Sequence, residues 1–258
     1  MTENAIREQV CEIGRQVYQK GFVAANDGNF SVRLADNRIL TTPTGISKGA
    51  MRPEQLVVVD MMGRVELGSQ SKPSSELLMH LFVYRERPEV GAVVHAHPIH
   101  ATGFATAGIA LDECIAAEII ATLGSVPLAP YGTPSTHELP ETLRSHIHRA
   151  DAMLLANHGV VTMGRDLHEA YFRLERIEHY AQIVLVARQL GGPQLLSQPQ
   201  VMKLFSLREK YRQTGLNPGC ASCEDACVGG SCPNYAVKYD PNSPDRLNEI
   251  VERVLRRL

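Results

Sequence analysis

Two histidines separated by a single residue, His95 and His97, close an apolar run of the sequence. Side chains two positions apart on a β-strand point to the same face of the sheet, so both imidazoles can reach one ion. A third imidazole, His158, follows a second apolar run over residues 152–156. Three neutral nitrogen ligands leave an open position on a divalent metal such as zinc, which is typical of a catalytic site. The alternative is that these are ordinary loop or core histidines, and the three together favour the metal.

Three short polar loops are candidates for holding a phosphate group. They are Gly28 with Asn29, Thr44 with Gly45, and Ser74 with Ser75, each at a predicted strand end or helix start. Backbone amides freed by glycine or at a helix N-terminus, with adjacent hydroxyls, bind a phosphate dianion without a cluster of basic residues. The same residue types are common turn formers, so each loop taken singly gives only weak support.

Glu76 follows the two serines at the predicted start of a helix. The helix dipole favours a carboxylate at that place, so one interpretation is a capping residue. Beside a three-histidine metal, the same carboxylate is a candidate proton shuttle. The sequence leaves both interpretations open.

Hydrophobic periodicity predicts the elements that position these residues. We expect helices over residues 5–20 with Asn4 as the cap, 77–87, 101–108, 138–150, 166–190 and 198–213. We expect hairpins over residues 30–42 and 56–67, a strand ending at His95 and His97, and strands over 152–156 and 160–163. Residues 116–123 fit a helix or a buried strand equally well. The pattern predicts an α/β fold with a mainly antiparallel or mixed sheet covered on both faces.

Composition narrows the class of protein. A chain of 258 residues suffices for one large domain or two small ones. The formal net charge of -2 gives no electrostatic reason to expect a nucleic acid or a membrane surface as partner. Since no apolar run approaches the ~18 residues of a spanning helix and no secretory signal opens the chain, we expect a cytoplasmic protein.

The order GN, TPTG, PSSE, HxHP and NHG, spread over residues 28–159, resembles the class II aldolase/adducin family, and specifically its fuculose-phosphate aldolase branch. The similarity spans about residues 5–215. It implies a three-layer αβα fold and a homotetramer with sites between subunits. It further implies a zinc ion on His95, His97 and His158, with Glu76 as the fourth resting ligand and acid/base group. The residues that would hold the substrate phosphate are Asn29, Thr44, Gly45, Ser74 and Ser75.

The activity implied by this resemblance is cleavage of a ketose 1-phosphate, such as L-fuculose 1-phosphate, to dihydroxyacetone phosphate and an aldehyde such as lactaldehyde. The chemistry suits the residues. Breaking a carbon–carbon bond next to a carbonyl leaves an enediolate, whose developing charge a chelated dication stabilises. A carboxylate must then deliver or remove a proton, and Glu76 fits that role.

The chain departs from the fuculose-phosphate aldolases at two tyrosine positions. In that branch a tyrosine from the neighbouring subunit lies in the segment matching residues 114–118, which has none here. A second family tyrosine would fall near Thr214, with Tyr211 as the nearest replacement, and Glu118 is either a substituted polar contact or structural. These changes leave the sugar specificity open.

Other branches of the family offer alternatives. The ribulose-phosphate 4-epimerases resemble this chain but carry Asp where Glu76 stands, and the methylthioribulose-phosphate dehydratases share the histidines but remove water. Glu76 therefore favours an aldolase. A non-enzymatic, adducin-like scaffold is disfavoured because adducin-like members lack the metal-binding histidines.

Beyond a catalytic domain over residues 1–215, the sequence predicts a cysteine-rich segment and linker over 216–242. Its four cysteines are Cys220, Cys223, Cys227 and Cys232. Their spacing suits a single tetrahedral thiolate metal site or an iron–sulfur cluster, and in a reducing compartment these are weighed before disulfides or free thiols.

Residues 243–258 are predicted to form an amphipathic helix, because their apolar side chains recur at helical spacing after Ser243 and Pro244. A helix this short is marginal alone, so its apolar face must dock on something. One interpretation is docking on its own tetramer. The other is a resemblance to the encapsulation peptides of bacterial microcompartment enzymes, which implies that residues 244–258 bind the shell or other cargo.

Overall fold

The computed structural model describes residues 1–210. Its helices are α1 (Glu3–Gln19), α2 (Leu77–Glu86), α3 (Ile99–Thr106), α4 (Glu138–Thr142), α5 (Leu167–Gln189) and α6 (Gln198–Lys210), with the short turns η1 (Lys48–Ala50), η2 (Pro53–Gln55) and η3 (Ile119–Leu123). Its strands are β1 (Asn29–Arg33), β2 (Ile39–Thr41), β3 (Val57–Val59), β4 (Ala92–Ala96), β5 (Leu128–Ala129), β6 (Ala152–Leu155) and β7 (Gly159–Gly164). The predictions for Tyr211, the four cysteines and the C-terminal helix fall outside the described residues and stay predictions.

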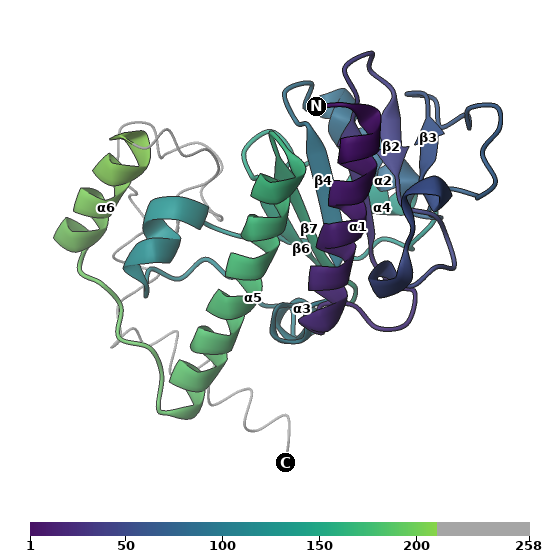
Figure 1. The fold of residues 1–258 in the computed structure, drawn as a ribbon. Helices are drawn as coiled ribbons and strands as arrows, with labels where there is room; N and C mark the ends of the chain where they lie inside the picture. Colours follow the sequence, from purple (N-terminus) through teal and green to yellow (C-terminus); the bar gives the residue numbers. More distant parts are fainter. Residues whose placement is uncertain (211–258) are drawn as a thin grey trace.

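The strands form one seven-stranded sheet in the order β3-β2-β1-β4-β7-β6-β5, with helices on both faces (Figure 1). Every neighbouring pair is antiparallel except β5 and β6, so the sheet is mixed. The predicted three-layer αβα fold is confirmed. Strand β4 lies at the centre, between β1 and β7, which brings its residues next to segments far away in the sequence.

Side chains alternate across the sheet and build a separate apolar core on each face. Val94 of β4 belongs to the core that also contains side chains of α1, α3 and α5. Val93 of the same strand belongs to the opposite core, with side chains of α2 and α4. Because His95 shares the parity of Val93, its ring lies on the face covered by α2, the helix that follows Glu76.

Helix α2 has a defined start and end. The backbone N–H of Leu77 donates to the carbonyl of Ser74 (3.2 Å), and the N–H of Glu76 donates to the hydroxyl of Ser74 (3.2 Å). At the other end Arg87 precedes Pro88, whose ring disfavours helical backbone in the residue before it. The predicted end before Pro88 is therefore confirmed.

Some local predictions differ from the structure. The cap of α1 is the hydroxyl of Thr2, which accepts from Ala5, and Asn4 lies inside the helix. The predicted turn after Asp60 is present, since the N–H of Asp60 donates to the Arg64 carbonyl (3.0 Å) and the N–H of Glu66 to the Val58 carbonyl (3.0 Å). Residues 64–67 nevertheless make only a single bridge to β3 and no full strand, because the Asp60 carboxylate takes the N–H groups of Met62 and Arg64.

Hydrophobic periodicity did not predict the end of α4, the conformation of residues 116–123 or the existence of β5. Helix α4 ends at Thr142, after which residues 143–149 continue as turns with several i to i−3 hydrogen bonds in place of the predicted helix to 150. The undecided segment around residues 116–123 contains the short π-helical turn η3. The two-residue strand β5 is too short to leave a periodic signal.

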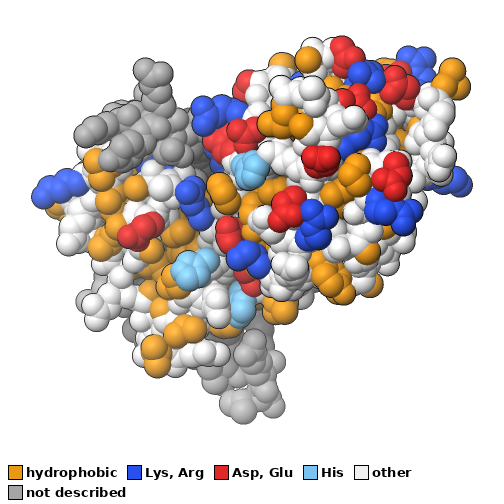
Figure 2. All heavy atoms as spheres, in the orientation of Figure 1, with side chains coloured by type: hydrophobic (Ala, Val, Ile, Leu, Met, Phe, Trp, Pro, Cys, Tyr) orange, Lys and Arg blue, Asp and Glu red, His pale blue; other side chains and the backbone are white. Residues whose placement is uncertain are grey.

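Charged and apolar side chains divide the visible surface unevenly. In Figure 2 charged side chains crowd the part over α1, whereas hydrophobic ones gather toward α5 and α6. Exposed apolar residues near the α3–α5 contact include Ile99, Leu185 and Val186. Ile99 and Leu185 line an apolar hollow of ≈ 750 Å³ between these two helices. Among the described residues, no helix is both long enough and apolar enough to cross a membrane.

Candidate active site and metal centre

His95, His97 and His158 meet at one end of the central strands, where one ligand atom of each lies within 4.8 Å of the others. His95 lies in β4 and His97 just after it, whereas His158 lies in the turn between β6 and β7. The antiparallel pairing of β4 with β7, which sets His95 opposite Val161, brings the two segments together. The sequence predicted this grouping from the strand-end positions of the three residues.

The turn that carries His158 depends on both of its neighbours. Asn157 has a left-handed backbone (φ 55°), which Asn tolerates better than most residues. A Cβ on Gly159 would lie 2.6 Å from the Ala96 carbonyl oxygen and 2.6 Å from the His97 ring. Only glycine lets this turn approach β4 closely enough for the third imidazole to reach the other two.

The donor atoms have the spacing that a divalent ion requires. Metal–nitrogen distances of about 2.0–2.1 Å in a tetrahedral site place the ligand atoms about 3.3–3.4 Å apart. His95 Nε2 lies 3.1 Å from His97 Nε2 and 3.3 Å from Glu76 Oε2, and His158 Nε2 lies 3.2 Å from Glu76 Oε1. Oε1 of Glu76 is also buried without a hydrogen-bond partner in the structure. The four side chains fit a small cation.

Protonation states also suit metal binding. Nδ1 of the fully buried His95 ring donates to the Val160 carbonyl (2.9 Å), which leaves the lone pair on Nε2 facing the other ligands. Burial lowers the pKa of His95 to about 3 and lowers the pKa of His97, so both rings are neutral at pH 7. Neutral imidazole is the form that binds a metal.

Glu76 points its carboxylate at the histidines and makes no capping hydrogen bond, so the structure does not support the capping interpretation. Burial acts to raise its pKa, but the positive charge that His95 and His158 carry when protonated and a hydrogen bond from Asn29 Nδ2 (2.7 Å) outweigh burial and hold the pKa of this carboxyl below its usual range. Glu76 is therefore ionised at neutral pH. A buried carboxylate beside a candidate metal can act as a ligand or as a base.

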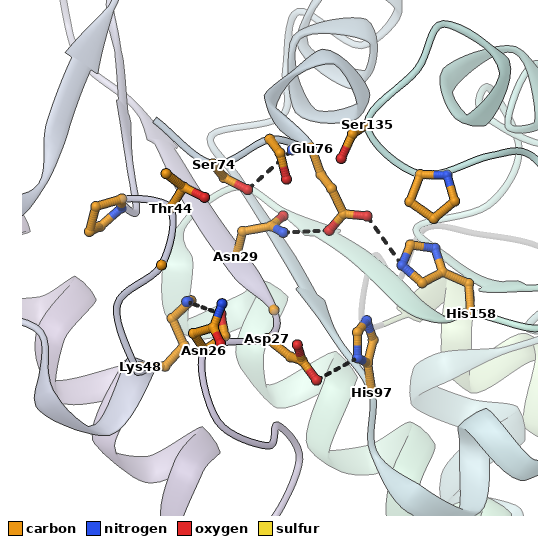
Figure 3. A pocket seen from close by; sticks show the side chains of 15 residues that line it. Asn26, Asp27, Asn29, Thr44, Lys48, Ser74, Glu76, His97, Ser135 and His158 are labelled. Atoms are coloured by element: carbon orange, nitrogen blue, oxygen red, sulfur yellow. Dashed lines mark hydrogen bonds and ion pairs between the residues drawn. The ribbon is translucent and has the colours of Figure 1, made fainter. Parts of the chain in front are cut away.

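The three polar loops meet in one pocket beside this cluster, with a volume of ≈ 590 Å³ (Figure 3). Two of them are tied together, because the N–H of Thr44 donates to the Lys72 carbonyl (3.0 Å) and the N–H of Ser74 to the Thr42 carbonyl (3.1 Å). All of the predicted phosphate-binding residues line the pocket: Gly28, Asn29, Thr44, Gly45, Ser74 and Ser75. The pocket thus joins a candidate metal centre to a cluster of hydrogen-bond donors.

Lys48 also lines this pocket, and no pattern in the sequence indicates a role for it. Its side chain is buried, and Nζ donates to the carbonyls of Asn26 (2.9 Å) and Ile46 (2.8 Å). Burial lowers the pKa of Lys48 to about 8, and the nearby Asp27 charge partly opposes this shift. The ammonium therefore brings positive charge to the loop end of the pocket at neutral pH.

Other positions were missed or differ from expectation. Asp27 lies 3.7 Å from His97 Nδ1, and Ser135, which has a left-handed backbone (φ 63°), also lines the pocket. Both lie in loops whose sequence carries no periodic signal. Glu118 is exposed and does not line this pocket, so it makes no contact there within the described chain.

Comparisons with known proteins identify the family of the chain. The model of the Class II Aldolase and Adducin N-terminal domain matches residues 8–185. The chain is 38% identical over 188 residues to a 3-oxo-tetronate 4-phosphate decarboxylase of Haemophilus influenzae, covering 71% of this chain and 88% of that protein. It is 32% identical over 209 residues to a 5-deoxy-D-ribulose 1-phosphate aldolase of Bacillus thuringiensis, covering 80% and 97%.

The fold leads to the same group of proteins. A solved L-fuculose 1-phosphate aldolase superposes with a TM-score of 0.73 at 28% identity, over 81% of this chain and 96% of that one. Together with the family match over more than half of the sequence, this similarity settles membership. The chain belongs to the class II aldolase and adducin family.

Proposed function

We propose that this protein is a metal-dependent carbon–carbon lyase that cleaves a ketose 1-phosphate, with L-fuculose 1-phosphate or a similar deoxy sugar phosphate as substrate. The observation that carries the proposal is the single pocket in which the cluster of three histidines and Glu76 adjoins three donor-rich loops. The aldolase named among the relatives, which matches 80% of this chain, supports the same reaction class.

In this proposal His95, His97 and His158 hold a divalent ion, with zinc as the first expectation and Glu76 as the fourth resting ligand. When bound, such an ion supplies Lewis-acid stabilisation of the oxygen charge that develops as the carbon–carbon bond breaks. The three imidazoles suit that role because His95 and His97 are neutral at pH 7 and the rings are held on the sheet.

Glu76 moves the proton. Its low pKa makes it a carboxylate at neutral pH, so it can accept a proton from the substrate and return it to the carbon left by cleavage. Asn29 Nδ2 donates to Oε2 and thereby holds the carboxylate next to His95. This hydrogen bond fixes the direction in which Glu76 presents its oxygens.

The loops anchor the phosphate at the other end of the pocket. The hydroxyls of Thr44 and Ser75 and the backbone amides around Gly45 supply donors without bulk. Lys48 adds a charge, since its ammonium lines the same region and is protonated below a pKa of about 8. The phosphate then fixes the distance from the anchored end to the carbon that reacts.

Decarboxylation of a 3-oxo acid phosphate is the second candidate, and the Haemophilus influenzae relative favours it. The two reactions share half of the substrate. A 3-oxo-tetronate 4-phosphate has a phosphate, a carbonyl and a hydroxyl-bearing carbon in the same order as a ketose 1-phosphate. Losing CO₂ from it leaves the same enediolate of dihydroxyacetone phosphate that losing an aldehyde leaves from the ketose.

The leaving group separates the two candidates. Loss of an aldehyde requires a base that removes the proton of the C4 hydroxyl, whereas loss of CO₂ requires none. Residues 114–118, where fuculose-phosphate aldolases carry a tyrosine, offer no phenol here, and Cys114 is buried in an apolar cluster. Without that phenol, Glu76 alone would have to take the proton of the C4 hydroxyl, and this difference is the second observation in favour of decarboxylation.

Product analysis of the metal-loaded protein tests the proposal. The protein is incubated with ketose 1-phosphates and, separately, with 3-oxo-tetronate 4-phosphate, and dihydroxyacetone phosphate, aldehyde and CO₂ are measured. An aldehyde product supports the aldolase, and CO₂ without aldehyde supports the decarboxylase. An isomer or a dehydrated product would instead identify an epimerase or a dehydratase, and no turnover with no bound metal would favour the scaffold.

We also propose that the chain assembles as a homotetramer, which the exposed apolar side chains around the α3–α5 hollow support. For residues 244–258 we propose recruitment to a larger assembly, by resemblance a bacterial microcompartment. Deleting these residues should leave turnover and the tetramer intact and abolish co-localisation with the shell. An inactive or unfolded deletion variant would place them in the catalytic core instead.

A further inference from the structure

A chain of buried polar side chains leads away from Glu76 into the core between β1 and α2. Asn29 and Ser31 lie two residues apart on β1 and so share one face of the sheet, while His80 and Tyr84 follow Glu76 at steps of four along α2 and share one face of the helix. The four residues beyond Glu76 have exposed fractions of 3% or less. Polar groups this deeply buried must satisfy one another.

We infer that His80 is a positioning residue: it fixes the amide of Asn29 and, through that amide, the carboxylate of Glu76. This inference rests on the proposed role of Glu76 in proton transfer. The role concerns orientation only, since His80 is not one of the three clustered histidines and does not line the pocket.

The direction of every hydrogen bond follows from the carboxylate. The amide nitrogen Nδ2 of Asn29 lies 2.7 Å from Oε2 of Glu76, and an amide nitrogen can only donate. Oδ1 of the same amide then faces His80 Nε2 at 2.5 Å. Because Oδ1 can only accept, Nε2 of His80 must carry the proton.

The remaining bonds continue in the same direction. Burial lowers the pKa of His80 to about 4, so its ring is neutral and Nδ1 is an acceptor. Ser31 Oγ, 2.7 Å away, therefore donates its only proton to Nδ1. Since Oγ has then no proton left to give, the Tyr84 hydroxyl at 2.9 Å donates to it. Each donor thus points toward Glu76, from Tyr84 to Asn29.

Reversal of this chain would oppose the carboxylate. If Nδ1 of His80 carried the proton, Nε2 would become an acceptor and the Asn29 amide would turn to satisfy it. Oδ1 of Asn29 would then face Oε2 of Glu76, and two oxygens 2.7 Å apart without a proton between them repel each other. Ser31 and Tyr84 prevent this by offering His80 a donor at Nδ1.

The tautomer of His80 is directly measurable. Long-range proton–nitrogen correlation spectra of the full-length protein with ¹⁵N-labelled histidine should show His80 protonated at Nε2, with the assignment made from the His80→Asn spectrum. In Ser31→Ala the donor at Nδ1 is lost and only the repulsion between Asn29 Oδ1 and Glu76 Oε2 still opposes the other tautomer, so a detectable minor share of it should appear. A wild-type ring protonated at Nδ1 would overturn the inference.

Kinetics of matched variants test the consequence. In His80→Gln the amide nitrogen can occupy the place of Nε2 and still donate to Asn29, so most of the wild-type kcat should remain. His80→Asn reaches only the place of Nδ1, and kcat should fall roughly 10- to 100-fold, as expected when one hydrogen bond supporting a charged group is lost, with KM nearly unchanged. Equal kcat values for the two variants would contradict the inference.

Two further variants separate orientation from simple loss of stability. If His80→Asn does not fold, Ser31→Ala can replace it in the test. The kcat of Ser31→Ala should also be lower than that of the wild type. Thr162→Val removes another buried hydroxyl, which donates to the Ala170 carbonyl (2.8 Å), and should lower the melting temperature without lowering kcat. If the kcat of Thr162→Val falls as much as that of Ser31→Ala, the lower kcat of both variants reflects reduced stability. That result would contradict the inference.

The measurements distinguish this inference from the proposed function. If the wild-type protein cleaves none of the sugar phosphates, the proposed function fails, while the His80 tautomer still decides whether the chain of donors points toward Glu76. If the enzyme is active and the tautomer is the opposite one, the positioning role fails alone.

Discussion

The two ends of the pocket are built in different ways. We call the end with the three histidines and Glu76 the reacting end. There His95 lies in the central strand β4 and Glu76 directly precedes the buried helix α2, and their side chains are 0% and 11% exposed. We call the end that we propose to hold the phosphate the anchoring end. Its hydrogen-bond donors lie in the loops around Gly45 and Ser75. In the proposed function the reacting end needs fixed side-chain geometry and uses long-range strand pairing, whereas the anchoring end needs only donors that face a phosphate.

This difference predicts how changes at each end will act. An interaction made mainly in the transition state lowers kcat when it is removed, whereas an interaction with the unreacting phosphate mainly raises KM. Substitutions at the reacting end should therefore reduce kcat or metal content. Substitutions at the anchoring end should weaken substrate binding.

The largest effect is expected for His158→Ala, which removes one of the three nitrogen donors. Bound metal and turnover should both be lost, because two imidazoles and one carboxylate hold a divalent ion much more weakly. The measurement is the metal content of each purified full-length protein. A control with Cys220, Cys223, Cys227 and Cys232 all changed to Ser should keep the ion of the histidine site. A His158→Ala protein that retains this ion would show that the ligand assignment is wrong.

Glu76→Gln should keep the metal and the phosphate affinity and lose turnover. Gln cannot accept the proton, and general acid/base catalysis contributes ~10²- to 10⁴-fold, so kcat should fall by that range. Asp151→Asn provides a control, because Asp151 is also a buried carboxylate but pairs with Arg87 (2.9 Å) and Arg173 (3.2 Å) away from the pocket. It should cost stability and leave kcat unchanged. Near-normal turnover in Glu76→Gln would remove the proton shuttle from the proposal.

The reacting end was largely visible in the sequence because its residues lie in regular elements. Alternation along β4 placed His95 and His97 on one side, and the end of an apolar run placed His158 in a turn. The sequence could not show that β4 pairs with β7, since strand pairing depends on packing over long range. The resemblance to a known family instead supplied the expectation that the three histidines share one ion.

The residues that were missed lie where local patterns carry no information. Lys48 follows a turn, and only its burial beside the carbonyls of Asn26 and Ile46 distinguishes it from a surface lysine. His80 lies in an apolar helix, so the sequence pattern indicates an ordinary core residue. Its spacing of four from Glu76 was a usable signal, but the partner Asn29 on β1 appears only in the fold.

Lys48→Met tests the charge at the anchoring end. Loss of a charge-assisted hydrogen bond should raise KM about 10- to 100-fold at pH 7, with a smaller change in kcat. The wild-type KM should also rise above pH 8, where the ammonium with its pKa of about 8 loses its proton, and KM of the variant should lack this rise. The same KM profile in both proteins would exclude Lys48 as a phosphate contact.

Stability provides an independent check on the pKa of Lys48. The folded protein holds this group at a pKa of about 8, below the value of about 10.4 of an unfolded lysine. Between these two values the unfolded chain binds more protons, so the free energy of unfolding rises with pH. Chemical denaturation of the wild type at pH 8 and pH 10 should show an increase that Lys48→Met lacks.

The smallest effect is expected for Ser75→Ala, and its comparison with Ser74→Ala locates the boundary between the two ends. Ser75 lines the pocket, so losing one neutral hydrogen bond to the phosphate should raise KM about 2- to 10-fold and leave kcat unchanged. Ser74 also lines the pocket, but its hydroxyl accepts from the backbone N–H of Glu76 (3.2 Å). Its loss should loosen the start of α2 and lower kcat as well as raise KM. The measurement is steady-state kinetics of both variants. If Ser74→Ala and Ser75→Ala change kcat and KM in the same proportions, the two serines do not mark a boundary between the reacting end and the anchoring end.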